Sequence, residues 1–283
     1  MSAFPAPSRF EARLLTKRLP TEAVVTPRDG GVALDTILPS PSPASALVRA
    51  AAIAANPGAT SLSAMPRRIV DQGEALKCCV SCALAGAMEA LNPGWPALGP
   101  VFHYHVTRFW GGADAEGCLF LDRGIATLTA RGICRESDHA SIFTPAGAKV
   151  RPSPAAFRDA RERRIPRNPL SFRYQHVGGT SRSAEIRRHL RQNHPVVATF
   201  TMPQNYPDSF LNEKFEWLDE NMPPPSPGRH CVLIVAFDDL LAGGRGGVRV
   251  IDSHGTEMFD GGTWWMAYRI LDSSSVLQVV ALT

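Results

Sequence analysis

The stretch from Gln72 to Ala85 constrains this chain more than any other, because it places a side-chain amide and a glycine shortly before a thiol at a helix start. After Cys79 the apolar residues recur at steps of three and four, which predicts one buried face of a helix, at Val80, Ala83, Leu84, Ala87, Met88 and Leu91. A thiol at a helix N-terminus lies near free backbone N–H groups and the positive end of the helix dipole, and both favour the thiolate. We therefore expect a nucleophile here, an amide donor able to stabilise an oxyanion, and a histidine elsewhere to act as base.

The composition is that of a folded protein with a large core, with 283 residues, 44% of them hydrophobic and 20% charged. The net charge of +4 is modest, and the arginines of residues 151–191 lack the aromatic interleaving or reader motif of a nucleic-acid-binding protein, so they indicate a solvated helix face. No apolar run approaches the roughly 20 residues that span a bilayer. No zinc-type spacing of cysteine and histidine is present, so we expect neither a metal nor a cofactor.

The 6 cysteines are too sparse for a disulfide scaffold, which favours a reducing compartment. The first 20 residues lack the apolar segment of a Sec signal. We therefore expect the protein to be cytoplasmic, or exported by a route that reads no N-terminal Sec signal.

The chain divides into an N-terminal extension, residues 1–60, and one folded domain, residues 61–283. The extension is rich in Pro, Ser and Ala and is expected to be loosely ordered, with one short helical run at Ala44–Ala55 and a possible role in docking a partner. The domain begins with helical periodicity and ends with β-branched runs separated by glycine turns, which predicts an α+β fold with a cleft between a helical half and an antiparallel sheet. Helices are expected at Val101–Trp110, Leu119–Arg131, Ala155–Arg164 and Ser183–Arg191, and strands at Ser171–Val177, Val196–Met202, Cys231–Phe237, Gly247–Asp252 and Ser275–Leu282, with a long proline-rich loop at Pro203–Gly228.

His230 is the best candidate for the base among the 8 histidines. It directly precedes the expected strand Cys231–Phe237, which would fix its backbone. The next expected strand ends at Asp252, so two neighbouring antiparallel strands could bring His230 and Asp252 within hydrogen-bond reach. A carboxylate there would fix the imidazole tautomer and stabilise the imidazolium. The other histidines are expected to have structural or surface roles, and Trp264 and Trp265 are expected to lie in the core.

Taken together, these motifs resemble the papain-type (C1) cysteine peptidases, most closely the bacterial branch that begins with an Asp-Gln-Gly element. The likeness covers roughly residues 60–275 and follows the family's order of motifs, at Asp71–Gly73, Cys79 with Glu89, Arg131–Glu136, Glu185–Val197, His230, Asp252–Gly255 and Gly261–Tyr268. The resemblance implies a two-lobe fold, with a central nucleophile helix in the helical lobe. It also implies Cys79 as nucleophile, His230 as base, Asp252 as orienter and Gln72 as oxyanion donor.

The chain departs from the family pattern in several respects, one of which is Val80 in place of the tryptophan that normally follows the nucleophile. The family has six residues from the glutamine to the nucleophile, whereas Cys79 follows Gln72 by seven, so Cys78 has the nominal spacing while Cys79 keeps the helix face and acidic residue in register. Cys82, one turn inside the helix, is the third candidate. Asp252 replaces the orienting asparagine, and His254 replaces the tryptophan that shields the orienter, which predicts that Asp252 is more solvated.

The resemblance implies hydrolysis of peptide bonds in a protein or peptide substrate through a thiolate and an acyl-enzyme intermediate. The carboxylate orienter also resembles transglutaminases and related acyl-transfer proteins, so transamidation or deamidation of protein glutamine is a second hypothesis. A catalytically silent binding module that uses the same cleft is the third. Subsite preference would depend on the loop Pro203–Gly228 and on residues around Trp110–Cys118.

Overall fold

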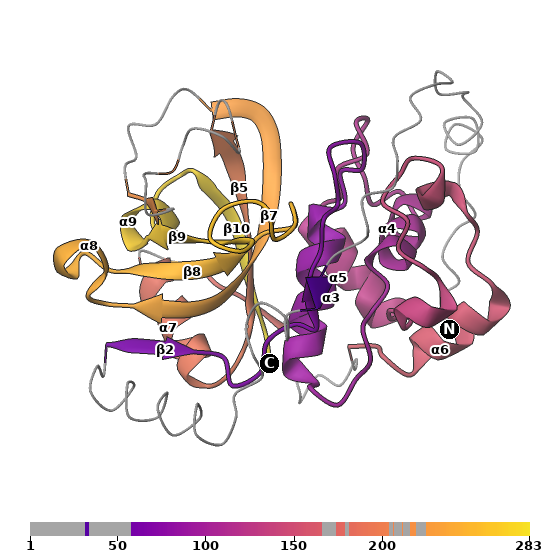
Figure 1. Cartoon of the computed structure of the whole chain (residues 1–283), viewed down its shortest axis with the longest axis horizontal. Coiled ribbons are helices and arrows are strands. Elements are labelled where there is room, and N and C mark those ends of the chain that lie inside the picture. Colours follow the sequence, from indigo (N-terminus) through magenta and orange to yellow (C-terminus); the bar gives the residue numbers. More distant parts are fainter. Residues whose placement is uncertain are drawn as a thin grey trace.

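The computed structural model of the chain describes residues 32–33, 58–165, 174–178, 181–203, 206, 211, 216–218 and 225–283. Two lobes lie side by side, one built of helices and one around a sheet, with helix α3 (Cys79–Leu91) at the boundary between them (Figure 1). The expected α+β, two-lobe organisation is therefore present.

The helical lobe contains α3, α4 (Pro100–Phe109), α5 (Leu121–Ala130), α6 (Pro154–Arg161) and the short 3₁₀ turns η2 (Glu136–Asp138) and η3 (Gly147–Lys149). Pro100 begins α4, a position where its missing N–H costs nothing. Ser153 Oγ accepts the Ala156 N–H at 3.1 Å and caps α6. Beyond α5, Gly132 has φ of +78°, and a Cβ there would lie 1.8 Å from the carbonyl oxygen of Ala160, so only glycine fits this helix end.

The second lobe is built on a sheet whose strand order is β4-β10-β5-β7-β8-β9-β6, with β2 also paired to β7. All of these pairings are antiparallel except that of β6 with β9. The strands are β2 (Ala59–Ser61), β4 (Tyr174–His176), β5 (Val196–Pro203), β6 (Glu216–Trp217), β7 (Pro225–Asp238), β8 (Gly247–Ile251), β9 (Thr263–Ala267) and β10 (Val276–Leu282). The lobe also carries α7 (Arg182–Arg191), α8 (Leu241–Gly244) and α9 (Tyr268–Leu271).

Strand β7 is longer than the sequence indicates and begins inside the expected loop Pro203–Gly228. His230 therefore lies within the strand, opposite Phe200 of β5, and does not precede it. The expectation was wrong because a register shift in the pairing of β5 with β7, between Thr201 and Pro203, lets the pairing continue through a proline-rich segment whose periodicity shows no strand. Further along β7, Leu233 pairs with Ile251, the last residue of β8, so the end of β8 lies near His230.

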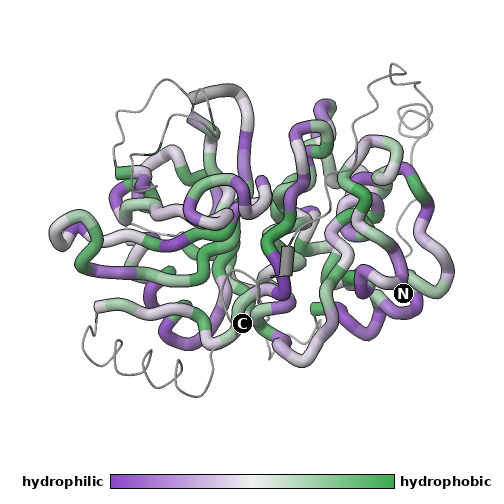
Figure 2. Tube along the Cα trace, viewed as in Figure 1, coloured by the Kyte–Doolittle hydropathy of each residue, from purple (hydrophilic) through white to green (hydrophobic). Residues whose placement is uncertain are grey.

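The core continues from the sheet into α3. The helix is buried along almost its whole length, because one side packs on the helical lobe and the other on β7. Figure 2 shows the apolar segments gathered in the central strands and along α3, where the two lobes meet. The first turn of α3 is thereby held against the middle of β7, which is the part of the strand that carries His230.

Most of the N-terminal extension, including the helical run expected at Ala44–Ala55, lies outside the described residues. One described part of the extension, β1 (Val32–Ala33), pairs antiparallel with β3 (Arg68–Ile69) of the folded domain. In the described part of the chain, no helix is both long and apolar enough to cross a membrane.

Candidate active site

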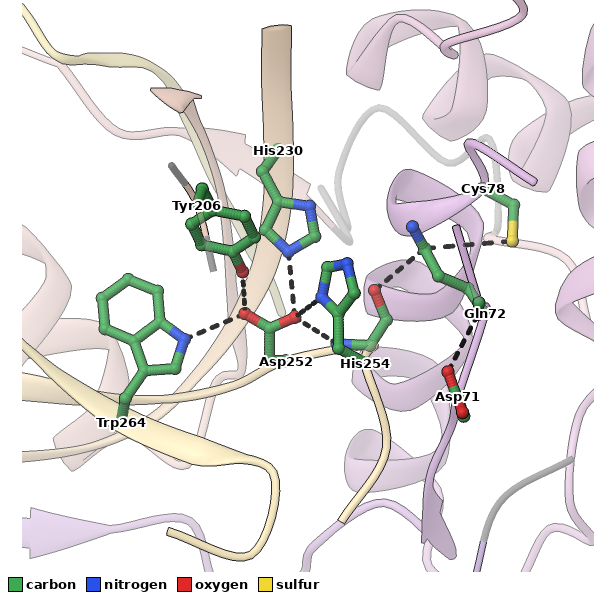
Figure 3. A network of polar contacts seen from close by, with 10 residues as sticks. Asp71, Gln72, Cys78, Tyr206, His230, Asp252, His254 and Trp264 are labelled. Atoms are coloured by element: carbon green, nitrogen blue, oxygen red, sulfur yellow. Dashed lines mark hydrogen bonds and ion pairs between the residues drawn. The ribbon is translucent and has the colours of Figure 1, made fainter. Parts of the chain in front are cut away.

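The contact expected between His230 and Asp252 is present. His230 Nε2 lies 3.0 Å from Asp252 Oδ1. A carboxylate can only accept, so His230 must carry its proton on Nε2. The other ring nitrogen, Nδ1, is then the basic one, and it points away from Asp252 (Figure 3). The carboxylate thus selects the tautomer that leaves Nδ1 ready to take a proton.

Asp252 receives donors at both carboxylate oxygens. Oδ1 also accepts the backbone N–H of Ser253 at 2.7 Å and Nδ1–H of His254 at 2.6 Å. Oδ2 accepts the indole N–H of Trp264 at 2.9 Å and the hydroxyl of Tyr206 (Figure 3). These donors come from β7, β9, the turn after β8 and residue 206, so Asp252 is fixed from several sides of the lobe.

The expectation that Asp252 is solvated was wrong, because its side chain is 0% exposed. Tyr206, Trp264 and His254 cover it, so the loss of the shielding tryptophan at position 254 is compensated by rings from elsewhere in the chain. Burial acts to raise the pKa of Asp252, but the charge of His230 and hydrogen bonds from His230 and His254 outweigh it and hold this pKa well below the usual range. Asp252 is therefore a buried carboxylate with hydrogen-bond donors at both oxygens.

Cys79 is the first residue of α3, and it lines a pocket of about 310 Å³ together with His230. The pocket lies between the lobes, with walls from Val80 and the segment 118–122 on one side and from β5, β7 and β10 on the other. The backbone N–H groups of Cys231 and Val80 interact with the Cys79 sulfur and favour its thiolate. The nucleophile candidate and the base candidate therefore share one cleft.

The helix start and burial act on the pKa of Cys79 in opposite directions. Burial is the dominant cause and raises the pKa of Cys79 to about 12, with the two backbone N–H groups acting against it. The side chain is nearly inaccessible, with the residue only 7% exposed, so the loss of hydration outweighs the favourable field of the helix end. Burial thus favours the neutral thiol, and the two backbone N–H groups favour the thiolate.

The other two cysteine candidates flank Cys79 along the chain, one directly before α3 and one a turn inside it. Cys78 is the N-cap residue, is 0% exposed, and its Sγ is 4.0 Å from Gln72 Oε1 and 3.7 Å from Cys82 Sγ. Neither Cys78 nor Cys82 is among the residues that line the pocket with His230. Burial raises the pKa of Cys78 well above its usual value. Of the three, Cys79 alone lines the pocket that holds His230, and Cys82 lines a separate pocket with Asp252 and Ser253.

Gln72 is held in the same region by Ser253. The Gln72 N–H donates to the Ser253 carbonyl at 2.8 Å, and Ser253 Oγ donates to Gln72 Oε1 at 2.9 Å. Fixing Oε1 in this way leaves the Nε2 group as the available donor, and Figure 3 shows it on the side of the amide that faces His230. Gly73 follows with φ of +62° and donates its N–H to Asp71 Oδ1 at 2.9 Å, a turn that favours glycine.

Glu89 has a structural role in the described residues. Its carboxylate accepts the backbone N–H of Arg67 at 2.6 Å and that of Leu98 at 2.7 Å, which ties both flanking segments to α3. Burial raises the pKa of Glu89, and these hydrogen bonds oppose that shift. The residue ten positions after Cys79 thus supports the helix from behind and stays away from the cleft.

His230, Asp252 and His254 place ligand-type atoms within 4.8 Å of one another. The nitrogens of His230 and His254 that face Asp252 carry the protons that they donate to it, so these two nitrogens act as hydrogen-bond donors. His103, by contrast, lies apart from the cleft, between Ser81 Oγ at 2.8 Å and the Gly124 carbonyl at 2.9 Å. Burial lowers its pKa to about 4, which fits the structural role expected for it.

Sequence reasoning missed Tyr206 and Trp264 as partners of Asp252. Tyr206 lies in a proline-rich segment without periodicity, so no signal pointed to it. Trp264 was assigned to the core, and it is fully buried there, but its indole N–H also serves Asp252. The register of β9 against β8 pairs Trp264 with Val250, two residues before Asp252, which brings the indole to the carboxylate. Trp265 is only half-buried and faces Arg249.

Comparison with known proteins gives matches only among solved structures, since no protein-family model and no curated protein matches the sequence. Xylellain, a cysteine protease from Xylella fastidiosa, is 21% identical with a TM-score of 0.63, covering 82% of this chain and 88% of its own. Bromelain from Ananas comosus is 13% identical with a TM-score of 0.55, covering 80% and 99%. A digestive procathepsin L 3 from Tenebrio molitor is 14% identical with a TM-score of 0.53, covering 80% and 69%.

These likenesses confirm that the chain has the two-lobe fold of papain-like cysteine proteases. Xylellain, a bacterial protein, fits the bacterial branch that the sequence motifs resemble. At these identities the comparison establishes the fold, and the chemistry has to be argued from the site itself.

Proposed function

We propose that this chain is a cysteine peptidase that hydrolyses peptide bonds through an acyl-enzyme intermediate. The observation that carries the proposal is that Cys79 and His230 line one pocket while a buried carboxylate fixes the tautomer of His230. The papain-like fold supports a peptidase, because the proteins that share it here are cysteine proteases.

In the first step, Cys79 Sγ attacks the scissile carbonyl carbon while His230 Nδ1 takes the thiol proton. Burial favours the thiol, so formation of the thiolate depends on proton transfer to His230, whose imidazolium Asp252 stabilises. The tetrahedral intermediate then collapses, and His230 returns the proton to the leaving amine. Water, activated by the same imidazole, releases the acid product and restores the thiol.

The oxyanion would be stabilised by Gln72 Nε2 and the backbone N–H of Cys79. The Cys79 N–H belongs to the first turn of α3, where N–H groups have no carbonyl partner within the helix. Ser253 holds the Gln72 amide oxygen, so the donor nitrogen is oriented before the substrate arrives. Preorganised donors of this kind typically contribute about 10²–10³ in rate.

The pocket beside the thiol suits a side chain of an extended peptide. Its walls combine apolar residues with polar ones, among them Leu119, Phe120, Leu277, Thr199 and Asp122. A peptide running between the lobes would place one side chain in this pocket and its scissile carbonyl at Cys79. The proposed substrate is accordingly a protein or peptide segment that can adopt an extended form.

Mass spectrometry of a mixed set of unfolded protein substrates tests the proposal. Wild-type protein should cleave chains, and Cys79→Ala should abolish cleavage with an unchanged fold. Cys118→Ala is the matched control, because Cys118 lines the same pocket and has no role in the chemistry proposed. A gain of about one mass unit or an amine adduct, without cleavage, would replace hydrolysis by deamidation or acyl transfer. Unaltered substrates would leave only a binding function.

A further inference from the structure

His254 occupies an unusual position in this network, because it competes with His230 for the same carboxylate oxygen. His254 Nδ1 is 2.6 Å from Asp252 Oδ1 and His230 Nε2 is 3.0 Å from it, and the two rings lie with centroids 5.1 Å apart (Figure 3). The His254 ring also contacts that of Tyr206, with centroids 5.6 Å apart. Two imidazoles thus share one anion, and of these two residues only His230 lines the pocket with Cys79.

The tautomer of His254 follows from the same argument as that of His230. Because Nδ1–H donates to Asp252, the position that gains a proton on acidification is Nε2. Its side chain is 19% exposed, whereas that of His230 is 3% exposed, so His254 can exchange a proton with solvent without breaking its bond to Asp252. His254 can therefore be neutral or positive while the network keeps its geometry.

We propose that His254 is a positioning residue that holds Asp252 and, through its charge, sets how readily His230 accepts the Cys79 proton. This rests on the proposed function, in which the imidazolium of His230 and the thiolate form together. A positive charge on His254 disfavours a second imidazolium at His230. The same charge stabilises the Cys79 thiolate more weakly, because the thiolate would face Nδ1 of His230, the nitrogen that points away from Asp252. The balance between thiol–imidazole and thiolate–imidazolium is therefore tipped toward the neutral pair when His254 is protonated.

The groups around His254 define this balance. Asp252 faces it from just after β8 and His230 from β7, Tyr206 lies against its ring, and Asp71 and Glu74 act on it from the segment before α3. Burial acts to lower the pKa of His254, but the hydrogen bond and charge of Asp252, with smaller contributions from Asp71 and Glu74, raise it above its ordinary value. His254 consequently keeps its positive charge to a higher pH than an ordinary imidazole does.

The test is the rate at which iodoacetamide alkylates Cys79, measured from pH 5 to 9 in the full-length protein. We expect the wild-type alkylation rate to rise in an additional step as His254 loses its proton. Removal of one positive charge at this distance from His230 should raise the rate about tenfold. His254→Asn can still donate to Asp252 but cannot become charged, so it should lack that step and be faster than wild type at pH ~6. His254→Phe keeps the ring and loses the donor, so it should be slower than His254→Asn at every pH.

Three outcomes would overturn the inference. The additional step could persist in His254→Asn, the Phe and Asn variants could have equal rates, or wild type could show no such step. A titration of ¹³C-labelled histidine in the wild-type protein checks the same point without a substitution, because the His230 resonance should shift at the pH where His254 titrates. If Cys79 is alkylated with a pH profile that the His254 substitutions leave unchanged, this inference is wrong and the proposed function stands. Absence of any label on Cys79 in wild type would end the proposed function.

Discussion

The indole N–H of Trp264 lies 2.9 Å from Oδ2 of Asp252, on the opposite side of the carboxylate from His230. Tyr206 donates to the same oxygen, so Oδ2 is occupied by two donors while Oδ1 serves the histidines. An indole can only donate. This arrangement explains why the chain has aspartate where related motifs have asparagine, because an amide NH₂ group could not replace Oδ2 beside Trp264.

Asp252→Asn is therefore expected to be severely damaging even though it introduces the residue of the related motif. The amide oxygen must face Trp264, which turns the NH₂ group toward His230 and the Ser253 N–H. His230 would then have to accept at Nε2 and carry its proton on Nδ1, where it cannot act as base. We expect kcat to fall by about three to four orders of magnitude, measured by peptide hydrolysis.

The matched control for that substitution is Asp260→Asn, which alters a more exposed carboxylate that is paired with Arg249. It should leave kcat unchanged. Near-normal activity in Asp252→Asn would show that the donors to Oδ2 do not require an aspartate at position 252.

Removing the hydroxyl that supports Asp252 should reduce both activity and stability. Tyr206→Phe leaves the buried carboxylate short of one donor, and a hydrogen bond to a charged group is worth about 1.5–3 kcal/mol. Tyr268→Phe removes a hydroxyl from Asp239, a carboxylate outside the site with a 27% exposed side chain, and is the matched control. We expect urea unfolding to show the larger loss for Tyr206→Phe, with kcat reduced only in that variant. Equal losses of kcat would contradict the role of Tyr206.

Gln72 and Ser253 should differ in the size of their contribution. Gln72→Ala removes the proposed oxyanion donor and should lower kcat about 10²–10³-fold with little change in KM. Ser253→Ala removes only the hydroxyl that orients the Gln72 amide at 2.9 Å, so a smaller loss of kcat is expected. Steady-state kinetics on one peptide compares the two. A drop confined to KM in Gln72→Ala would assign the amide to substrate binding.

The raised pKa of Cys79 predicts how stability depends on pH. In the unfolded chain a thiol ionises near pH ~8.5, whereas in the folded protein burial raises the pKa of Cys79 to about 12. The stabilisation from keeping this thiol neutral is fully present below pH ~8.5 and is lost as the pH rises toward the folded-state value. Wild type should therefore lose free energy of unfolding relative to Cys79→Ser between pH 8 and 10, under reducing conditions. The opposite trend would show that Cys79 rests as a thiolate.

Local patterns predicted the elements that carry the site, and their success has physical reasons. The spacing of Val80, Leu84 and Met88 predicts α3 because one helix face is buried between two lobes. The alternation and β-branched residues after His230 and before Asp252 predict neighbouring strands, and β7 and β8 do pair antiparallel. The contact between His230 and Asp252 follows from that pairing.

What the sequence could not reveal depends on packing between distant segments. Tyr206 and Trp264 reach Asp252 from a proline-rich segment and from β9, so burial of the orienter is a tertiary property. The extension of β7 through Pro225 depends on a register shift against β5. The raised pKa of Cys79 likewise reflects enclosure by both lobes, which outweighs the favourable effect of the helix start.

Site-resolved thiol labelling tests the central claim most directly, because three cysteines stand at the start of one helix. Wild-type protein is treated with less than one equivalent of an iodoacetamide probe near pH 7, digested, and fragmented to assign the label within residues 78–82. We predict the label on Cys79, its loss in Cys79→Ala, and its loss in His230→Ala at the same pH. Label on Cys78 or Cys82, or labelling of Cys79 that is indifferent to His230, would contradict the account.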